Sequence, residues 1–222
     1  EYRWHYQTTP RDRWDYTATQ QITLAHLPLG EGGADRRVVM QAPKNGFFYV
    51  LDAADGELIS ATPFTAQNWT TGEFDENGRP VLIQDAVDMA LTVVIPGPTG
   101  AHNWHPMAFN PDTGLVYIPV NEIPFFYDKT RNVENSKSFW NLGYDAAAGW
   151  PVEYPAGTLD AVADLDGGSL LAWDPVKAEP RWAVPFALPL NGGVLSTDAG
   201  LVFQGNKFGD LVAYDAETGE RL

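Results

Sequence analysis

Short apolar runs, several with large side chains alternating with polar ones, follow one another along this chain and predict β-strands. Three of them share a longer pattern, in which an apolar run ends in Asp and is followed by a short turn, a Glu and a second run. The three copies are "FYVLDAADGELIS", "LLAWDPVKAEPRWAV" and "DLVAYDAETGERL", which begin at Phe48, Leu170 and Asp210. A tight turn between two such runs predicts a β-hairpin.

The hairpin pattern repeats at fixed internal spacing, with Glu five positions after Asp. The pairs are Asp52 and Glu57, Asp174 and Glu179, and Asp215 and Glu220. The middle copy continues to Trp182, and the chain opens with the second half of the pattern, Glu1-x-x-Trp4. Successive glutamates lie 56, 122 and 41 positions apart, and a spacing of about 40–50 residues matches one four-stranded propeller blade.

We therefore predict an all-β fold, a partial β-propeller of three to four four-stranded blades. The longest gap would hold two blades and an excursion from Glu122 to Gly168. Residues 1–222 would form one propeller domain, truncated at both ends within blade repeats, because both ends fall inside the pattern. We expect the tryptophans of the pattern to dock one blade against the next. A β-sandwich of short strands is the alternative.

The amino-acid composition of the chain argues against several classes of function and site. The net charge is −15, with 29 acidic against 14 basic residues, which argues against binding to a nucleic-acid backbone. The chain has no Cys, which excludes zinc–thiolate sites and a C-x-x-C-H haem attachment within it. No apolar run approaches the roughly 18 residues of a membrane span.

One short stretch carries a candidate for chemistry. In "TTPRDRWDYTATQQ", Asp15 stands between Trp14 and Tyr16. Aromatic neighbours exclude water, so a carboxylate between them needs a partner or a chemical role. The alternative is that Asp15 begins a turn and accepts a hydrogen bond from its own backbone.

Several longer stretches together resemble one family. They are "WHYQTTPRDRWDYTATQQ", "QAPKNGFFYVLD", "GPTGAHNWHPMAFNPDTGLVYIPVNEIP", "LLAWDPVKAEPRW" and "NGGVLSTDAGLVFQG". In this order they are similar to the pyrroloquinoline quinone (PQQ)-dependent alcohol dehydrogenases, and especially to the quinohaemoprotein ethanol dehydrogenase branch. The resemblance implies an eight-bladed propeller in the periplasm, with PQQ near the axis beside calcium. It also implies oxidation of primary alcohols to aldehydes by hydride transfer to PQQ, and an electron acceptor such as a cytochrome c.

The resemblance also implies roles for individual residues. Asp15 would be the catalytic base and a calcium ligand, shared with ligands outside this chain. Lys44, Asn103 and Trp104 would contact PQQ. Thr17 stands where lanthanide-using relatives carry a second Asp, so the metal would be calcium.

Two of these motifs have rival interpretations. Lys44 precedes Asn45-Gly46, a strong turn pair, and would then be a solvated turn lysine. His102 and His105 flank the Asn-Trp pair and would form a metal site, although Gly100 and Pro106 make the required helix improbable.

The family's other calcium ligands and its vicinal disulfide do not lie in this chain, and haem c is possible only in the parent protein. We therefore expect the isolated chain to be inactive. A non-catalytic propeller that serves as a protein-binding scaffold in the cell envelope is the alternative function, because blade repeats exist for packing. A sugar-oxidising quinoprotein fits the motifs less well.

Overall fold

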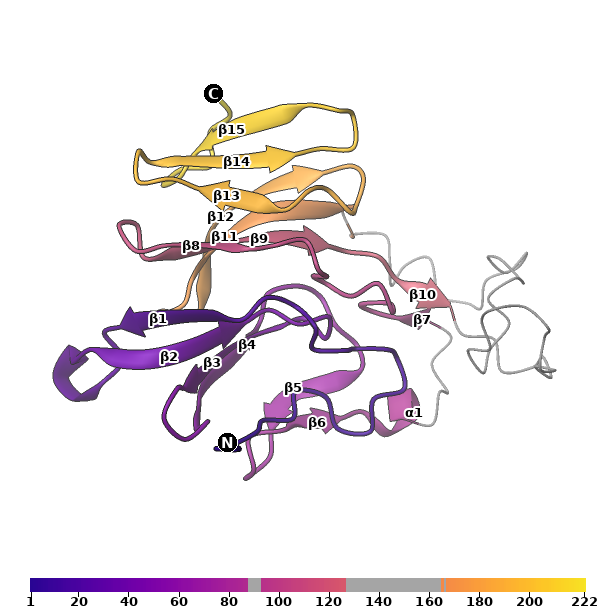
Figure 1. Ribbon diagram of the computed structural model, residues 1–222. Coiled ribbons are helices and arrows are strands. Elements are labelled where there is room, and N and C mark those ends of the chain that lie inside the picture. Colours follow the sequence, from indigo (N-terminus) through magenta and orange to yellow (C-terminus); the bar gives the residue numbers. More distant parts are fainter. Residues whose placement is uncertain (88–92, 127–164, 166) are drawn as a thin grey trace.

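Antiparallel β-sheets make up almost all of the regular structure in the computed structural model, which describes residues 1–87, 93–126, 165 and 167–222 (Figure 1). The first blade is a four-stranded sheet in chain order, β1 (Thr23–Leu27), β2 (Arg36–Gln41), β3 (Phe47–Asp52) and β4 (Leu58–Pro63). The middle blade has the order β12-β11-β9-β8, formed by β8 (Ala108–Asn110), β9 (Leu115–Asn121), β11 (Gly168–Asp174) and β12 (Glu179–Phe186). The last blade is three-stranded, with β13 (Val194–Ser196), β14 (Leu201–Gly205) and β15 (Leu211–Asp215).

Smaller elements lie outside the three blades. They are the pair β5 (Thr70–Phe74) and β6 (Pro80–Leu82), the pair β7 (Val93–Val94) and β10 (Phe125–Phe126), and the short helix α1 (Gln84–Val87). A 3-10 turn, η1 (Glu31–Gly33), joins β1 to β2. No helix in the described ranges is both long enough and apolar enough to cross a bilayer.

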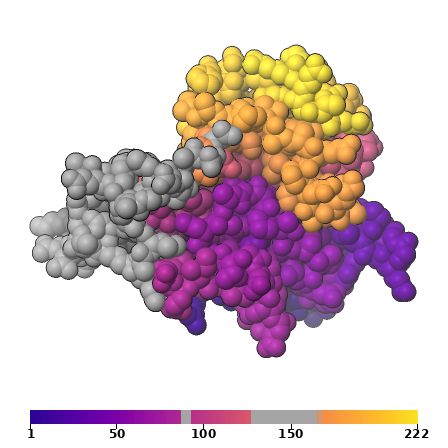
Figure 2. Space-filling model, turned by 180° about the vertical axis from the view of Figure 1, so that it is seen from behind, coloured from indigo at the N-terminus to yellow at the C-terminus, as the bar shows by residue number. Residues whose placement is uncertain are grey.

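The three blades stack face to face, as Figure 1 shows from the indigo first blade to the yellow last one. One buried cluster joins the first and middle blades and includes Met40, Val50, Ile118 and Trp173. A second cluster joins the middle and last blades. Figure 2 shows the same succession from behind, with the orange and yellow C-terminal residues packed above the purple ones. Alternation along each strand supplies an apolar residue to each of these interfaces.

A third buried cluster covers the opposite face of the first blade. Phe47 and Tyr49 of β3 pack there against Trp14 and Tyr16 of the N-terminal segment and against Trp69, the residue before β5. The rings of Trp14, Tyr16 and Trp69 lie with centroids 5.5 Å apart in each pair. This aromatic packing fixes the N-terminal segment against the first blade and thereby places the residue between the two rings, Asp15.

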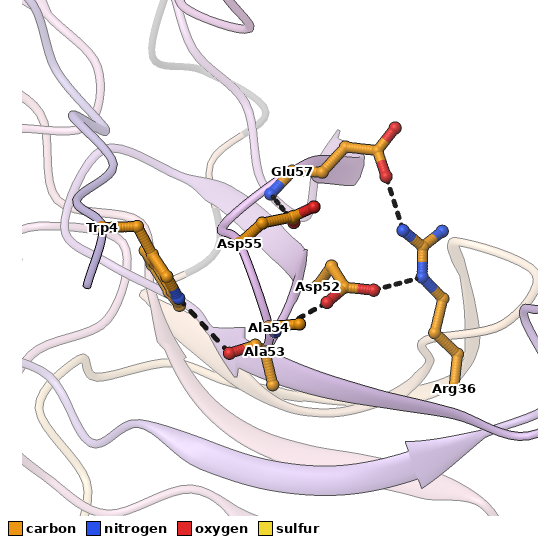
Figure 3. Close-up of polar contacts among 7 residues, drawn as sticks. All are labelled: Trp4, Arg36, Asp52, Ala53, Ala54, Asp55 and Glu57. Atoms are coloured by element: carbon orange, nitrogen blue, oxygen red, sulfur yellow. Dashed lines mark hydrogen bonds and ion pairs between the residues drawn. The ribbon is translucent and has the colours of Figure 1, made fainter.

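The predicted hairpins are present, and Figure 3 shows the first of them. The Asp52 carboxylate accepts the backbone N–H of Ala54 and pairs with the guanidinium of Arg36, which also pairs with Glu57 (Figure 3). The hydrogen bond from Ala54 and then the one from Arg36 lower the pKa of Asp52. The Asp of the pattern therefore accepts a hydrogen bond from the backbone of its own turn, and the Glu of this copy pairs with Arg36 of β2.

The tryptophans of the pattern dock on the next hairpin, as predicted. Trp4 Nε1 donates to the carbonyl of Ala53 at 3.3 Å (Figure 3), and a Cβ on Gly56 would lie 2.5 Å from its ring. Trp182 of the middle blade repeats both relations on the hairpin of the last blade. Its Nε1 donates to Ala216 at 3.1 Å, and a Cβ on Gly219 would lie 2.7 Å from its ring.

One detail of the prediction is wrong. Between Glu57 and Glu179 the described residues form one four-stranded blade and the two-stranded pairs, and not two blades. Most of the predicted excursion from Glu122 to Gly168 lies outside the described residues. The β5–β6 pair takes the place expected for a blade because its short strands, with Gly72 and a Pro at the start of β6, form only a small ribbon.

Candidate active site

Asp15 lies on the opposite side of the backbone from its aromatic neighbours. Its φ is +65°, a conformation that Asp tolerates better than most residues. Trp14 and Tyr16 are buried, whereas the Asp15 side chain is 64% exposed. The expectation that the two rings exclude water from Asp15 is therefore wrong, because the left-handed backbone turns the carboxylate away from them.

The carboxylate does have the partner that the sequence required. Lys44 Nζ donates to Asp15 Oδ2 at 2.9 Å and to the Asp15 backbone carbonyl at 3.0 Å. The Lys44 side chain is only 9% exposed, so the rival interpretation of a solvated turn lysine is wrong. A turn is present between β2 and β3, but its central residues are Lys44 and Asn45 instead of the predicted pair Asn45-Gly46, because Gly46 N donates to the Pro43 carbonyl.

The loop that carries Asn103 packs directly on Lys44. Ala101 N donates to the Lys44 carbonyl at 2.9 Å, and a Cβ on Gly100 would lie 2.3 Å from Lys44 Cγ. Only glycine fits at this position, since its φ is +81° and the lysine stem fills the space. The backbone of Gly100 and Ala101 thus joins the Asn103 loop to the Asp15–Lys44 pair.

Asn103 and Trp104 have different surroundings. Asn103 is buried; its Nδ2 donates to the Thr99 carbonyl at 2.7 Å and its Oδ1 accepts from Trp104 N at 2.9 Å. Trp104 is 71% exposed, and its ring stacks on His105 with centroids 5.1 Å apart. The Asn103 amide therefore shapes its own loop, and Trp104 presents a flat apolar face to the outside.

His102 lies just before the Asn-Trp pair and was a ligand of the rival metal site. It is fully buried; Nδ1 lies 2.6 Å from the Ala42 carbonyl and Nε2 lies 2.7 Å from the His105 carbonyl. Burial lowers the pKa of His102, while its hydrogen bonds to these two carbonyls act in the opposite direction. Because backbone carbonyls occupy both ring nitrogens, the rival interpretation of a His102–His105 metal site is wrong.

Two glutamines missed at the sequence level tie this site together. Gln20 Nε2 donates to the His102 carbonyl at 3.3 Å, and Gln41 Nε2 donates to the carbonyls of Ala18 and Gln20 at 3.1 and 2.9 Å. Both side chains are buried. The position of Gln41 on the strand "RVVMQ", where a buried position carries an amide, is the one signal that could have marked it.

Comparison with known proteins agrees with the fold. Residues 1–68 match the family described as "PQQ: Glucose/ethanol/alcohol dehydrogenase, beta-propeller domain". The chain is 47% identical over 229 residues to quinohemoprotein alcohol dehydrogenase ADH-IIG of Pseudomonas putida, and 49% identical over 220 residues to ADH IIB of the same species. These alignments include 100% and 99% of this chain and 31% and 30% of the relatives.

A solved structure gives the same result. The crystal structure of quinohemoprotein alcohol dehydrogenase from Comamonas testosteroni superposes with a TM-score of 0.81 at 43% sequence identity, over 100% of this chain and 32% of that one. The fold is thus a partial β-propeller of the PQQ-dependent dehydrogenase class. The sequence resemblance to the quinohaemoprotein alcohol dehydrogenases is confirmed along the whole chain, which spans about 30% of the length of these relatives.

Proposed function

We propose that this chain is an internal segment of a PQQ- and calcium-dependent dehydrogenase that oxidises primary alcohols to aldehydes. Its similarity to quinohaemoprotein alcohol dehydrogenases supports the class. The observation that carries the site is the hydrogen bond of 2.9 Å between Lys44 and Asp15 beside the Asn103 loop. A scaffold protein has no need of this pair, because the blades pack through other residues.

The donor set suits PQQ, a flat tricarboxylate with two quinone oxygens. Lys44 Nζ has three N–H groups, two of which are directed to Asp15, and Asn103 Nδ2 has a second N–H beyond the one given to Thr99. Trp104 offers an exposed ring. Lys44, Asn103 and Trp104 would therefore hold the cofactor.

Calcium requires more ligands than the described residues bring together. It takes six to eight oxygen ligands in proteins. Within the described parts of the chain, no group of three or more His, Cys, Asp or Glu side chains is placed to hold a metal ion. Asp15 would supply one ligand to calcium and other segments of the parent protein would supply the rest.

The chemistry assigned to this chain is proton removal. The Asp15 carboxylate accepts the hydroxyl proton of the alcohol. Lys44 fixes the orientation of this carboxylate through Oδ2, which leaves Oδ1 for the substrate. When bound, PQQ takes up the hydride that leaves the alcohol carbon, so that the alcohol loses one proton and one hydride and becomes an aldehyde.

The parent protein also has a proposed compartment and a proposed electron acceptor. The parent protein would work in the periplasm, would pass electrons to an acceptor such as a cytochrome c, and would carry haem c outside this chain. Each of these statements comes from the resemblance to the quinohaemoprotein branch.

The test is alcohol oxidation by the full-length protein with PQQ and calcium, measured with a dye as electron acceptor. Asp15→Asn keeps the shape of the side chain but removes its basicity. We expect kcat to fall by about 10²–10⁴-fold, the range for loss of a general base. PQQ should remain bound, as measured by its absorbance. Asp35→Asn, at an exposed surface carboxylate, is the matched control and should retain the wild-type rate.

Two results would contradict the proposal at different levels. Wild-type rates in Asp15→Asn would show that another group is the base. A wild-type protein that binds neither PQQ nor calcium, and oxidises no alcohol, would end the dehydrogenase assignment.

A further inference from the structure

The ring of His102 stands between the two segments that carry the proposed cofactor residues. Through Nδ1 it contacts the carbonyl of Ala42, two residues before Lys44. Through Nε2 it contacts the carbonyl of His105, which closes the loop that holds Asn103 and Trp104. The same ring therefore spans the distance between the lysine turn and the Asn-Trp loop.

Neighbouring contacts give this ring little freedom. The carbonyl of His102 accepts from Gln20, five residues after Asp15. Gln41, next to Ala42, donates to two carbonyls of the segment that follows Asp15. All three segments of the candidate site thus meet around His102, which is 0% exposed.

We propose that His102 is a positioning residue for this site, whose ring holds the Lys44 turn and the Asn103–Trp104 loop at a fixed separation. The inference rests on the proposed function and goes beyond it, because His102 itself does not touch cofactor or substrate. A protonated ring donates to both carbonyls. A neutral ring donates to one of them and fills the space between both. In either state the ring prevents the two segments from closing together or drifting apart.

Loss of the His102 ring should affect the reaction because reaction rates are sensitive to the misplacement of catalytic and cofactor-binding groups. A shift of about 1 Å in a positioned group can cost up to about 10²-fold in rate. Loss of the ring would remove the contact that each of these two carbonyls makes with it and open a cavity between the two segments, so the segments should move. Asp15 depends on the same arrangement, because Lys44 holds its carboxylate.

The experiment compares His102→Ala and His102→Gln in the full-length protein with wild type. The first readout is the Kd for PQQ of the metal-supplemented apoprotein, followed by quenching of tryptophan fluorescence. The second is kcat and KM for ethanol, and the third is the unfolding temperature. His26→Ala is the matched control, since His26 is a solvent-exposed histidine of β1.

We expect His102→Ala to weaken PQQ binding and to lower kcat, each by about tenfold or more, with KM for ethanol changed less than about twofold. His102→Gln should recover part of both losses, because its amide donates to one of the two carbonyls. Should the alanine variant not fold, the glutamine variant alone carries the test, with a smaller loss expected. His26→Ala should match wild type.

The inference is overturned if the His102 variants unfold at lower temperature yet keep the wild-type PQQ Kd and kcat at 25 °C, because the ring is then merely structural. Its failure is distinct from that of the proposed function. A wild-type protein that binds PQQ but oxidises no alcohol refutes the function, and the PQQ Kd still tests His102.

Discussion

At the scale of single residues, one backbone torsion at Asp15 directs its carboxylate away from the buried rings of its two neighbours. The residue adopts φ +65°, which costs roughly 1–2 kcal/mol for a residue with a side chain. In return, Trp14 and Tyr16 enter the aromatic cluster while the carboxylate between them reaches Lys44. The packing of the buried rings of Trp14 and Tyr16 holds the backbone of Asp15 in this conformation.

A glycine next to this pair provides a test of how closely Lys44 is packed. Gly100→Ala introduces a Cβ 2.3 Å from Lys44 Cγ and 2.7 Å from its Cα, at φ +81°. Gly114→Ala introduces the same strain at φ +70° with no atom within 4 Å. We expect both variants to lose about 1–2 kcal/mol of stability from the backbone strain, and Gly100→Ala to lose about 1–3 kcal/mol more from overpacking. Only Gly100→Ala should also weaken PQQ binding. Thermal unfolding and a PQQ titration of the full-length protein measure the two effects.

Gly100 and Gly114 share a left-handed backbone, so the two variants share the backbone strain. They differ in the contact of the added Cβ with Lys44, which only Gly100→Ala makes. Equal PQQ affinity in the two variants would mean that Lys44 adjusts to the added methyl group, and that its position does not limit cofactor binding.

The candidate site was predictable only in part. Asp15, Lys44 and Asn103 were proposed from motifs, and the structure brings Asp15 and Lys44 into a direct ion pair. The exposure of Asp15 was not foreseen, because alternation along a sequence does not reveal a positive φ at a residue other than glycine. His102 and Gln20 were not recognised as tethers because their contacts cross 60 and 82 residues of sequence.

At the scale of elements, the hairpin motif explains why certain positions are glycine. Gly56 and Gly219 have φ values of +79° and +75°, and a tryptophan ring covers each. In the middle motif the same position is Ala178, at φ +56°. The preceding blade carries Ser60 where the pattern would place its tryptophan. Positive φ alone therefore does not demand glycine here, and the stacked tryptophan is the additional requirement.

The contact between Trp182 and Gly219 should contribute to the docking of the last blade. Gly219→Ala places a Cβ 2.7 Å from the Trp182 ring, whereas Gly200→Ala, at φ +76°, meets nothing within 4 Å. Both variants share the backbone strain, and overpacking should add about 1–3 kcal/mol to the loss in Gly219→Ala. Chemical unfolding of the full-length protein, followed by tryptophan fluorescence, measures the difference. Equal losses would mean that Trp182 moves aside without cost.

The elements differ in how far the sequence revealed them. The hairpins at Asp52, Asp174 and Asp215 were predictable because a tight turn, a capping carboxylate and flanking apolar runs lie within a dozen residues. The pairs β5–β6 and β7–β10 were not, because their strands are short and β7 meets β10 from about thirty residues away. Local signals predict hairpins, and pairings between distant short strands depend on tertiary packing.

At the scale of the whole molecule, the stacked blades bury groups that titrate near neutral pH. Burial lowers the pKa of both His102 and His105 in the folded protein. The pKa values of Asp52 and Asp215 are also lowered, but from a value of 3.8, so these carboxyl groups titrate well below the range of the histidines. Among the described residues, the two histidines are therefore the groups of shifted pKa that couple folding to pH between pH 5.5 and 7.5.

The sign of this coupling leads to a prediction of lower stability in acid. A histidine whose pKa is depressed by folding binds fewer protons in the folded state than in the unfolded state, so the free energy of unfolding rises with pH. The full contribution is present above the ordinary histidine pKa of about 6.5 and is lost as pH falls, by at most about 1.4 kcal/mol per pH unit for each group. Urea unfolding of the full-length protein at pH 7.5 and 5.5 should therefore give a lower free energy at pH 5.5. His102→Gln, which cannot take up the proton, should reduce that difference, whereas His26→Gln should not. A difference unchanged in His102→Gln would mean that His102 takes up its proton at the same pH in the folded and unfolded states, and that burial and the two carbonyl contacts cancel.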